Sequence, residues 1–135
     1  MSDYHNILAS TSAVFGGFSL AFLGVMLSGG VSGRASDWTI RTSTLSATIF
    51  TVTGLGWSLA ASAAAVSPDS GPAMVTTFKP SHRLLSQLFI LGVALFIATI
   101  GFSGWVRSRS LGLFSTTAAV VGFLLVFRIL SPFIN

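Results

Sequence analysis

The chain has 135 residues, of which 52% are hydrophobic and 7% are charged, and its mean hydropathy is +0.85. A soluble domain carries roughly 25% charged residues, so much of this surface must face lipid rather than water. The net charge of +4 reflects a shortage of acids. Because the basic residues are scattered along the whole chain, we expect no nucleic-acid partner. Cysteine is absent, which excludes disulfides and thiolate metal sites.

Four apolar stretches are long enough to cross a bilayer as helices, which takes about 20 residues each. They cover residues 7–27, 43–66, 84–106 and 111–134. The intervening segments 28–42, 67–83 and 107–110 are rich in glycine, serine, proline or charge and are predicted as loops. Continuous apolar runs lack the period of two that a β-barrel requires. The sequence therefore predicts an all-α, multi-pass membrane protein in one domain, 1–135, which we place in the plasma or cell membrane.

The first span is predicted to be a retained helix rather than a signal peptide, because residues 1–6 contain no lysine or arginine and three more spans follow. Its orientation is open. Four basic residues fall on the side of the first and third loops and three on the opposite side. This difference leans towards both termini outside, but it does not decide the topology by the positive-inside rule.

Small residues recur at four-residue spacing, a pattern that lets helices approach closely in lipid. One line in the first span contains Ala13 and Gly17, and continues to Ala21. A second line, in the second span, consists of Gly54, Ser58 and Ser62. Either line could pack helices within one protomer or form an interface between protomers, and the sequence leaves both readings open. A chain of 14.1 kDa has little interior, so a transport path would lie more naturally between copies of a symmetric homo-oligomer.

Ionisable groups are nearly absent from the four spans, which argues against a proton-coupled or cation-coupled transporter. Arg128, near the end of the fourth span, is expected to extend to lipid headgroups. His5 and His82 are lone histidines far apart in sequence, and the acidic residues fall in separate segments. We therefore expect no enzyme, no cofactor and no metal site.

Several short motifs, in order along the chain, resemble the Orai calcium-release-activated channels. Thr11-Ser12-Ala13 followed by Gly17-Phe18 is similar to the T-S-A-x-x-x-G-F run of that family's first helix. In the second span, Ser46-Ala47 and the terminal Pro68 fall at similar spacing. The third span carries Gly92, Leu95-Phe96 and Ala98 and ends in Trp105-Val106-Arg107, and the fourth opens with Ser115-Thr116-Thr117.

The resemblance implies a four-helix protomer that assembles as a hexamer around its first helices. The residues it turns towards the pore are Val25, Ala21, Phe18, Val14, Ser10 and Asn6. Their spacing of three or four residues is helical, so one face can carry them all. The apolar part, from Val25 to Val14, would form a hydrophobic constriction that gates by dewetting, with Gly17 and Phe18 as its hinge.

The departures from the family concern the residues that give calcium selectivity. The family's selectivity glutamate falls on Val25, and its basic inner positions fall on Ser10, Asn6 and Ser2. A ring of valines cannot bind calcium as a ring of carboxylates does. The acidic residue of the family's third helix falls on Thr99, and the proline of its fourth helix falls on Val121. The resemblance also puts both termini inside, against the lean of the basic residues.

Two functions fit these features. The first is an Orai-like channel that passes ions or small solutes through a pore lined by the first helix, without calcium selectivity. The alternative is a non-catalytic accessory subunit that packs against a larger membrane complex, supported by the small-residue content and the lack of reactive groups. The expected partners are therefore the lipid bilayer, further copies of the chain or another membrane protein.

Overall fold

The computed structural model describes residues 2–30, 32–66 and 71–134, with side chains over 4–30, 32–63, 81–126 and at 128. Within these ranges the chain forms α1 (Ser2–Ser28), α2 (Arg34–Val66), α3 (Gly71–Ser103) and α4 (Arg109–Ile134), and a 3-10 turn, η1 (Gly104–Val106), precedes α4. The all-α prediction is confirmed. Each of the four helices includes a segment long and apolar enough to cross a membrane. These segments are Tyr4–Ser28, Arg34–Ala63, Ser81–Val106 and Arg109–Val126.

The helices are longer than the four predicted spans, so the prediction of loops over 34–42 and 71–83 is wrong. Serine and threonine do not interrupt α2, because many of their hydroxyls donate to a carbonyl in the preceding turn and others bond to a neighbouring helix. The Thr39 hydroxyl, for example, donates to the Ala35 carbonyl at 2.7 Å. Pro72 lies in the first turn of α3, where a missing N–H costs little. The turn between α1 and α2 is short and uses the positive φ angles of Gly30 and Gly33.

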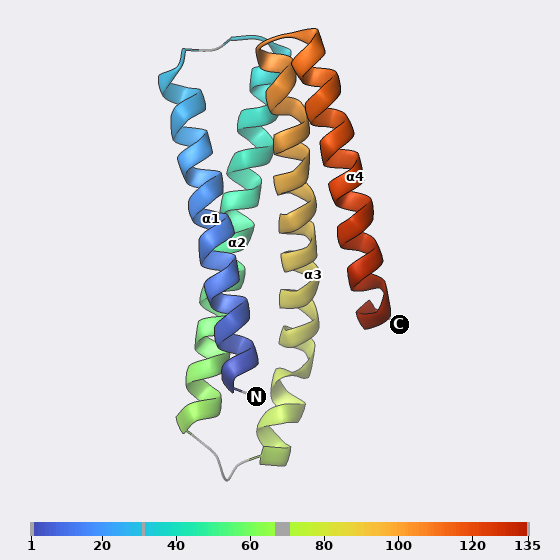
Figure 1. Cartoon of the computed structure of the whole chain (residues 1–135). Helices are drawn as coiled ribbons and strands as arrows, with labels where there is room; N and C mark the ends of the chain where they lie inside the picture. Colours follow the sequence, from blue (N-terminus) through green and yellow to red (C-terminus); the bar gives the residue numbers. More distant parts are fainter. Residues whose placement is uncertain (1, 31, 67–70, 135) are drawn as a thin grey trace.

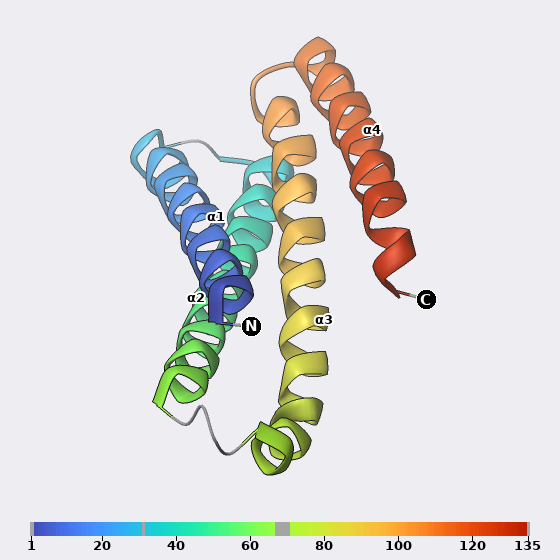
Figure 2. The same cartoon turned by 60° about the horizontal axis from the view of Figure 1, so that its bottom comes forward.

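The four helices form an open row rather than a closed bundle. α2 packs against both α1 and α3 along much of its length, whereas α4 packs against α3 and η1 and touches neither α1 nor α2 in the described part of the chain. Figure 2 shows α3 standing between α4 and the pair formed by α1 and α2. Both ends of the chain lie at the same end of the row, and the α1–α2 and α3–α4 turns lie at the other (Figure 1). One long side of α1 is therefore left without a helix against it.

Small hydroxyl side chains fill the interior, and large apolar side chains cover the outside. The buried polar residues are Ser12, Ser19, Ser36, Thr39, Thr42, Ser43, Ser46, Thr53 and Thr99. Ser46, on α2, connects three helices, since its hydroxyl shares a 3.3 Å hydrogen bond with that of Ser19 on α1 and donates to the Gly92 carbonyl on α3 at 3.2 Å. This distribution is the reverse of that in a soluble protein, and it fits a bilayer. Apolar surface that faces lipid carries no free-energy cost, whereas polar groups in the interior must be hydrogen-bonded.

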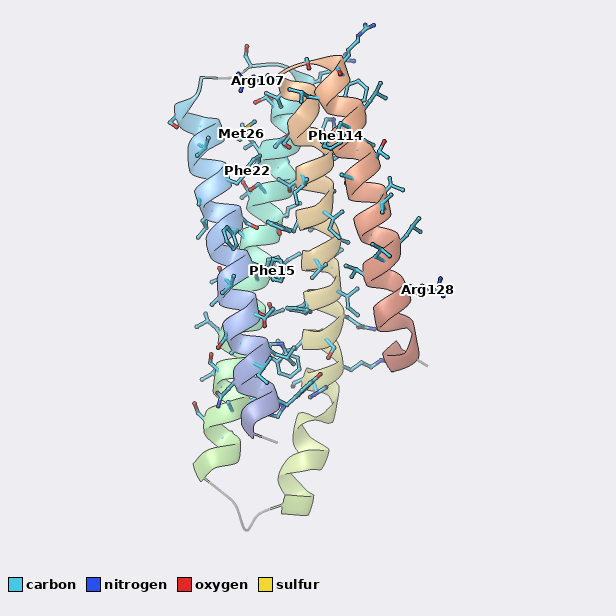
Figure 3. The ribbon with its side chains drawn as sticks, viewed as in Figure 1. Phe15, Phe22, Met26, Arg107, Phe114 and Arg128 are labelled. Carbon is cyan, nitrogen blue, oxygen red and sulfur yellow. The ribbon has the colours of Figure 1, made fainter. Side chains whose placement is uncertain are left out.

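An aromatic cluster fills the middle of the interior beside the hydroxyls. Phe50 of α2 is 0% exposed. It stacks on Phe15 of α1 with ring centroids 5.3 Å apart and meets Phe89 of α3 edge to face at 5.8 Å. Phe15 also meets Phe96 of α3 at 5.3 Å, and Figure 3 shows Phe15 directed from α1 towards α3. The cluster holds α1, α2 and α3 together at mid-height.

Candidate functional site

The six residues predicted to line a pore all lie on exposed positions of α1. They are Asn6, Ser10, Val14, Phe18, Ala21 and Val25. The exposed fraction is 67% for Val25 and 62% for Phe18. A row of apolar side chains this exposed on adjacent turns indicates a surface that contacts lipid or protein rather than water. The row is continuous from the α1–α2 turn to the first turns of the helix. It therefore offers a single surface for lipid or for a second protein chain.

The opposite side of α1 is packed against α2 through a different set of small residues. Ser12 and Ser19 are buried, and the Ser43 hydroxyl of α2 donates to the Ser19 carbonyl at 2.8 Å. At Gly16 an added Cβ would lie 3.4 Å from the Cβ of Phe50, so a methyl group there would be in van der Waals contact with α2 and a larger side chain would clash. Sequence reasoning missed this line, which is offset by one residue from the predicted one.

The structure divides the residues predicted to pack helices. Gly54 faces α1, since a Cβ on it would lie 3.4 Å from the Cβ of Ser12. Ala13 and Gly17 are exposed on the outward side of α1, and a Cβ on Gly17 would have nothing within 4 Å. Ser58 and Ser62 are also exposed, and their hydroxyls donate to carbonyls one turn earlier in α2. Of the residues predicted to pack helices, Gly54 thus packs inside the protomer, whereas Ala13 and Gly17 form a strip of small residues on its surface.

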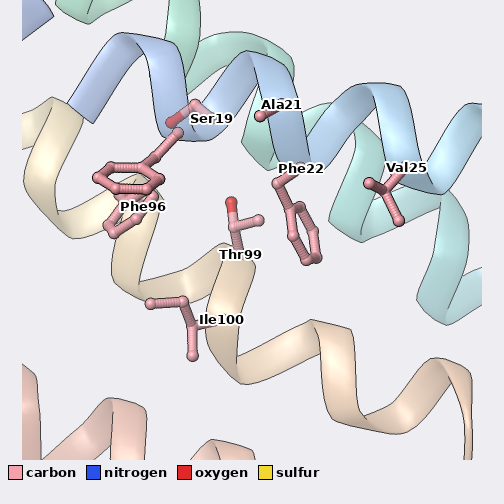
Figure 4. Close-up of a pocket in the computed structure, with 8 residues that line it drawn as sticks. Ser19, Ala21, Phe22, Val25, Phe96, Thr99 and Ile100 are labelled. Atoms are coloured by element: carbon pink, nitrogen blue, oxygen red, sulfur yellow. The ribbon is translucent and has the colours of Figure 1, made fainter. Parts of the chain in front are cut away.

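A groove of about 300 Å³ runs between α1 and α3 beside this strip. Phe18, Ala21 and Val25 form part of one wall, and Figure 4 shows Phe22 and Val25 on α1 facing Thr99 and Ile100 on α3. The Thr99 hydroxyl donates to Thr42 of α2 at 3.0 Å, so it is already satisfied. The accessible surface of the groove is apolar, which suits hydrocarbon or an apolar side chain rather than an ion.

The two histidines treated above as lone residues are brought together at the end of the row that carries the termini. The His5 ring of α1 stacks on Trp57 of α2 at 5.5 Å, and His82 of α3 contacts both rings, at 5.9 Å from His5 and 4.9 Å from Trp57. The His5 Nδ1 and Trp57 Nε1 atoms are buried without a hydrogen-bond partner among the described residues. The cluster joins three helices. Among the described side chains, no carboxylate lies beside either imidazole.

No three histidine, cysteine or acidic side chains gather into a metal site within the described residues. Arg128 is exposed on α4, just beyond the apolar segment, and points away from the other helices in Figure 3. This position agrees with the expected contact to headgroups, which stays a prediction. The outward side of α1 and the adjoining groove are thus the most distinctive surface of the protomer.

Comparisons with protein-family models, with curated proteins and with solved structures find no match for this chain. The resemblance to the Orai family therefore stays a prediction, and the functional argument rests on the protomer itself.

Proposed function

We propose that the chain is the protomer of a homo-oligomeric membrane channel whose pore is lined by α1. The pore would pass ions or small solutes without calcium selectivity, in line with the Orai-like motifs. The observation that carries the proposal is that all six residues predicted for the pore lie on one exposed side of α1, which packs against α2 and scarcely contacts α3 among the described residues.

The side chains of this surface favour contact with protein over contact with lipid alone. Helices associate in bilayers where small residues let backbones approach, since apolar side chains gain nothing by leaving lipid. The outward side of α1 carries such residues on successive turns. They are Ser10, Ala13, Gly17, Ala21 and Gly24, all exposed. Copies of α1 could therefore approach one another about a common axis.

The chemistry along this surface would give a pore with two parts. From Val25 to Val14 the large side chains are apolar, and rings of them narrow enough to exclude water would close the path by dewetting. Ser10 and Asn6 follow on the last turns before the amino terminus and offer hydroxyl and amide groups. With no carboxylate among the six predicted pore residues, this part of the path would lack the ligands that calcium prefers.

The absence of cysteine makes single-cysteine labelling a direct test. In reconstituted bilayers, Val25→Cys and Phe18→Cys should react with a charged thiol reagent from the aqueous phase, and the reaction should change the single-channel conductance. Phe114→Cys is the matched control, because this side chain is 75% exposed on α4, remote from the proposed pore. Its thiol should remain in lipid and its modification should leave the conductance unchanged.

Native mass spectrometry on the same samples separates the proposal from the accessory-subunit alternative. A single closed-ring species, six copies in the Orai-like case, supports the channel. Labelling of Val25→Cys no faster than that of Phe114→Cys would contradict a pore along α1. A protomer recovered in fixed ratio with a different membrane protein would favour the accessory role.

A further inference from the structure

The end of the row that carries the two turns concentrates positive charge. Its basic residues are Arg34 and Arg41 of α2, Arg107 after η1, and Arg109 at the start of α4. Asp37 is the acidic residue at this end, so its formal charge is +3. The remaining basic and acidic residues of the sequence, Lys79, Arg83, Arg128, Asp3 and Asp69, sum to +1. Most of the chain's net charge of +4 is therefore carried by the end with the two turns.

These arginines are exposed and lie on neighbouring elements. The Arg41 guanidinium stands 5.9 Å from the centre of the Trp38 ring, and Trp38 in turn lies 6.4 Å from Phe102 near the end of α3. η1 follows directly and leads to Arg107. Arg34, Arg107 and Arg109 have no ion-pair partner among the described side chains. Within the described part of the chain, these three guanidinium groups are therefore available to a ligand.

Two tryptophans mark the same level of the molecule. Trp38 and Trp105 are both exposed, and the Trp105 Nε1 atom donates to the Thr116 hydroxyl at 2.8 Å, which fastens η1 to α4. Tryptophan side chains gather where hydrocarbon meets the headgroups of a bilayer. We therefore expect the arginines beside them to lie at the depth of the lipid phosphates.

We propose that this surface, made of Arg34, Arg41, Arg107, Arg109, Trp38 and Trp105, binds the headgroups of anionic phospholipids. A guanidinium group offers paired donors that match a phosphate, and basic residues next to a membrane are attracted to its anionic lipids. Zwitterionic lipids present the same phosphate next to a cationic amine, so the excess charge of this end favours an anionic headgroup. The proposal is independent of the pore and applies equally to a protomer or an assembly.

Native mass spectrometry of the full-length protein, with phosphatidylglycerol and phosphatidylcholine added in turn, measures bound lipid for each. The wild type should retain phosphatidylglycerol in preference. The double variant Arg107→Gln/Arg109→Gln should weaken that binding by about five-fold for each arginine removed. Lys79→Gln/Arg83→Gln is the control, since it removes the same charge from the other end and should retain the preference.

Arg107→Lys/Arg109→Lys separates charge from local structure, because it keeps the two cations. It should hold phosphatidylglycerol far better than the glutamine variant. Equal binding of the two lipids by the wild type would overturn the proposal. An equal loss in the control, or the same loss with lysine as with glutamine, would also overturn it.

Discussion

The two sides of α1 carry the same kinds of small residue but have different surroundings. Ser12, Gly16 and Ser19 are buried against α2, and an added Cβ at Gly16 would already be in van der Waals contact with Phe50. Ala13 and Gly17, one position further along, are exposed, and a Cβ on Gly17 would meet no atom within 4 Å. Small residues at helical spacing therefore show that a helix is suited to close contact, but not which side makes it within the protomer.

The outward side of α4 gives the comparison a reference point, because its exposed residues are large and apolar. They include Leu113, Phe114, Val120, Val121, Leu124 and Leu125. Lipid chains accommodate such bulk, whereas a second helix packs closely only where side chains are small. The exposed side of α1 also carries large apolar residues, among them Val14, Phe18 and Val25, but it adds a line of small exposed residues, Ala13, Gly17 and Ala21. This line is what suggests an occupant other than lipid.

The largest expected difference in unfolding free energy between the two sides of α1 comes from removing one phenylalanine ring. Phe50 is fully buried beneath the inner side of α1, while Phe18 is 62% exposed on the outer side. Phe50→Ala should reduce the free energy of unfolding of the protomer by about 3 to 5 kcal/mol, since it opens a cavity in the aromatic cluster. Phe18→Ala should change it by less than about 0.5 kcal/mol. Titration with a denaturing detergent in mixed micelles measures both, and equal losses would contradict the assignment of the two sides.

Adding a side chain to adjacent glycines gives a second, smaller difference. Gly16→Leu forces a bulky group against Phe50 and should destabilise the protomer by about 1 to 3 kcal/mol. Gly17→Leu meets no atom within 4 Å in the protomer, so the free energy of unfolding should stay within about 0.5 kcal/mol of the wild type. If copies meet along α1, Gly17→Leu should instead shift native mass spectra from oligomer to protomer. An oligomer that survives this change would place the contact elsewhere.

Much of the fold follows from the sequence. Four long apolar stretches require four helices in lipid, because an unpaired backbone cannot lie in hydrocarbon. The errors lie at the helix ends, where the glycine, serine, proline and charge content predicts loops over residues 34–42 and 71–83. Hydroxyls that bond within the helix, as Thr39 does, remove that penalty. Amino-acid composition indicates which structure a segment prefers in isolation, whereas local hydrogen bonds determine where these helices end.

The contacts between helices could not be predicted to the same extent. His5 and His82 are 77 positions apart in the numbering of the chain, and only the side-by-side packing of α1, α2 and α3 brings their rings together around Trp57. The line of Ser12, Gly16 and Ser19 was in principle visible in the sequence. It was hidden because Ala13 and Gly17 have the same four-residue spacing as Ser12 and Gly16. Choosing between them requires the partner helix, which no local pattern specifies.

The smallest expected effect concerns the hydroxyls that join α1 and α3 to α2. Ser46→Ala removes the bonds to Ser19 and to the Gly92 carbonyl, and hydrogen bonds between membrane helices contribute about 0.6 kcal/mol each on average. The protomer should therefore lose about 1 kcal/mol of unfolding free energy by the same detergent titration. Ser58→Ala on the same helix is the control, because that exposed hydroxyl bonds only within α2, to Gly54, and its loss should be close to zero. A loss for Ser58→Ala as large as for Ser46→Ala would mean that the buried hydroxyls add nothing beyond helix propensity. The inner and outer sides of α1 would then differ only in their aromatic and glycine contacts.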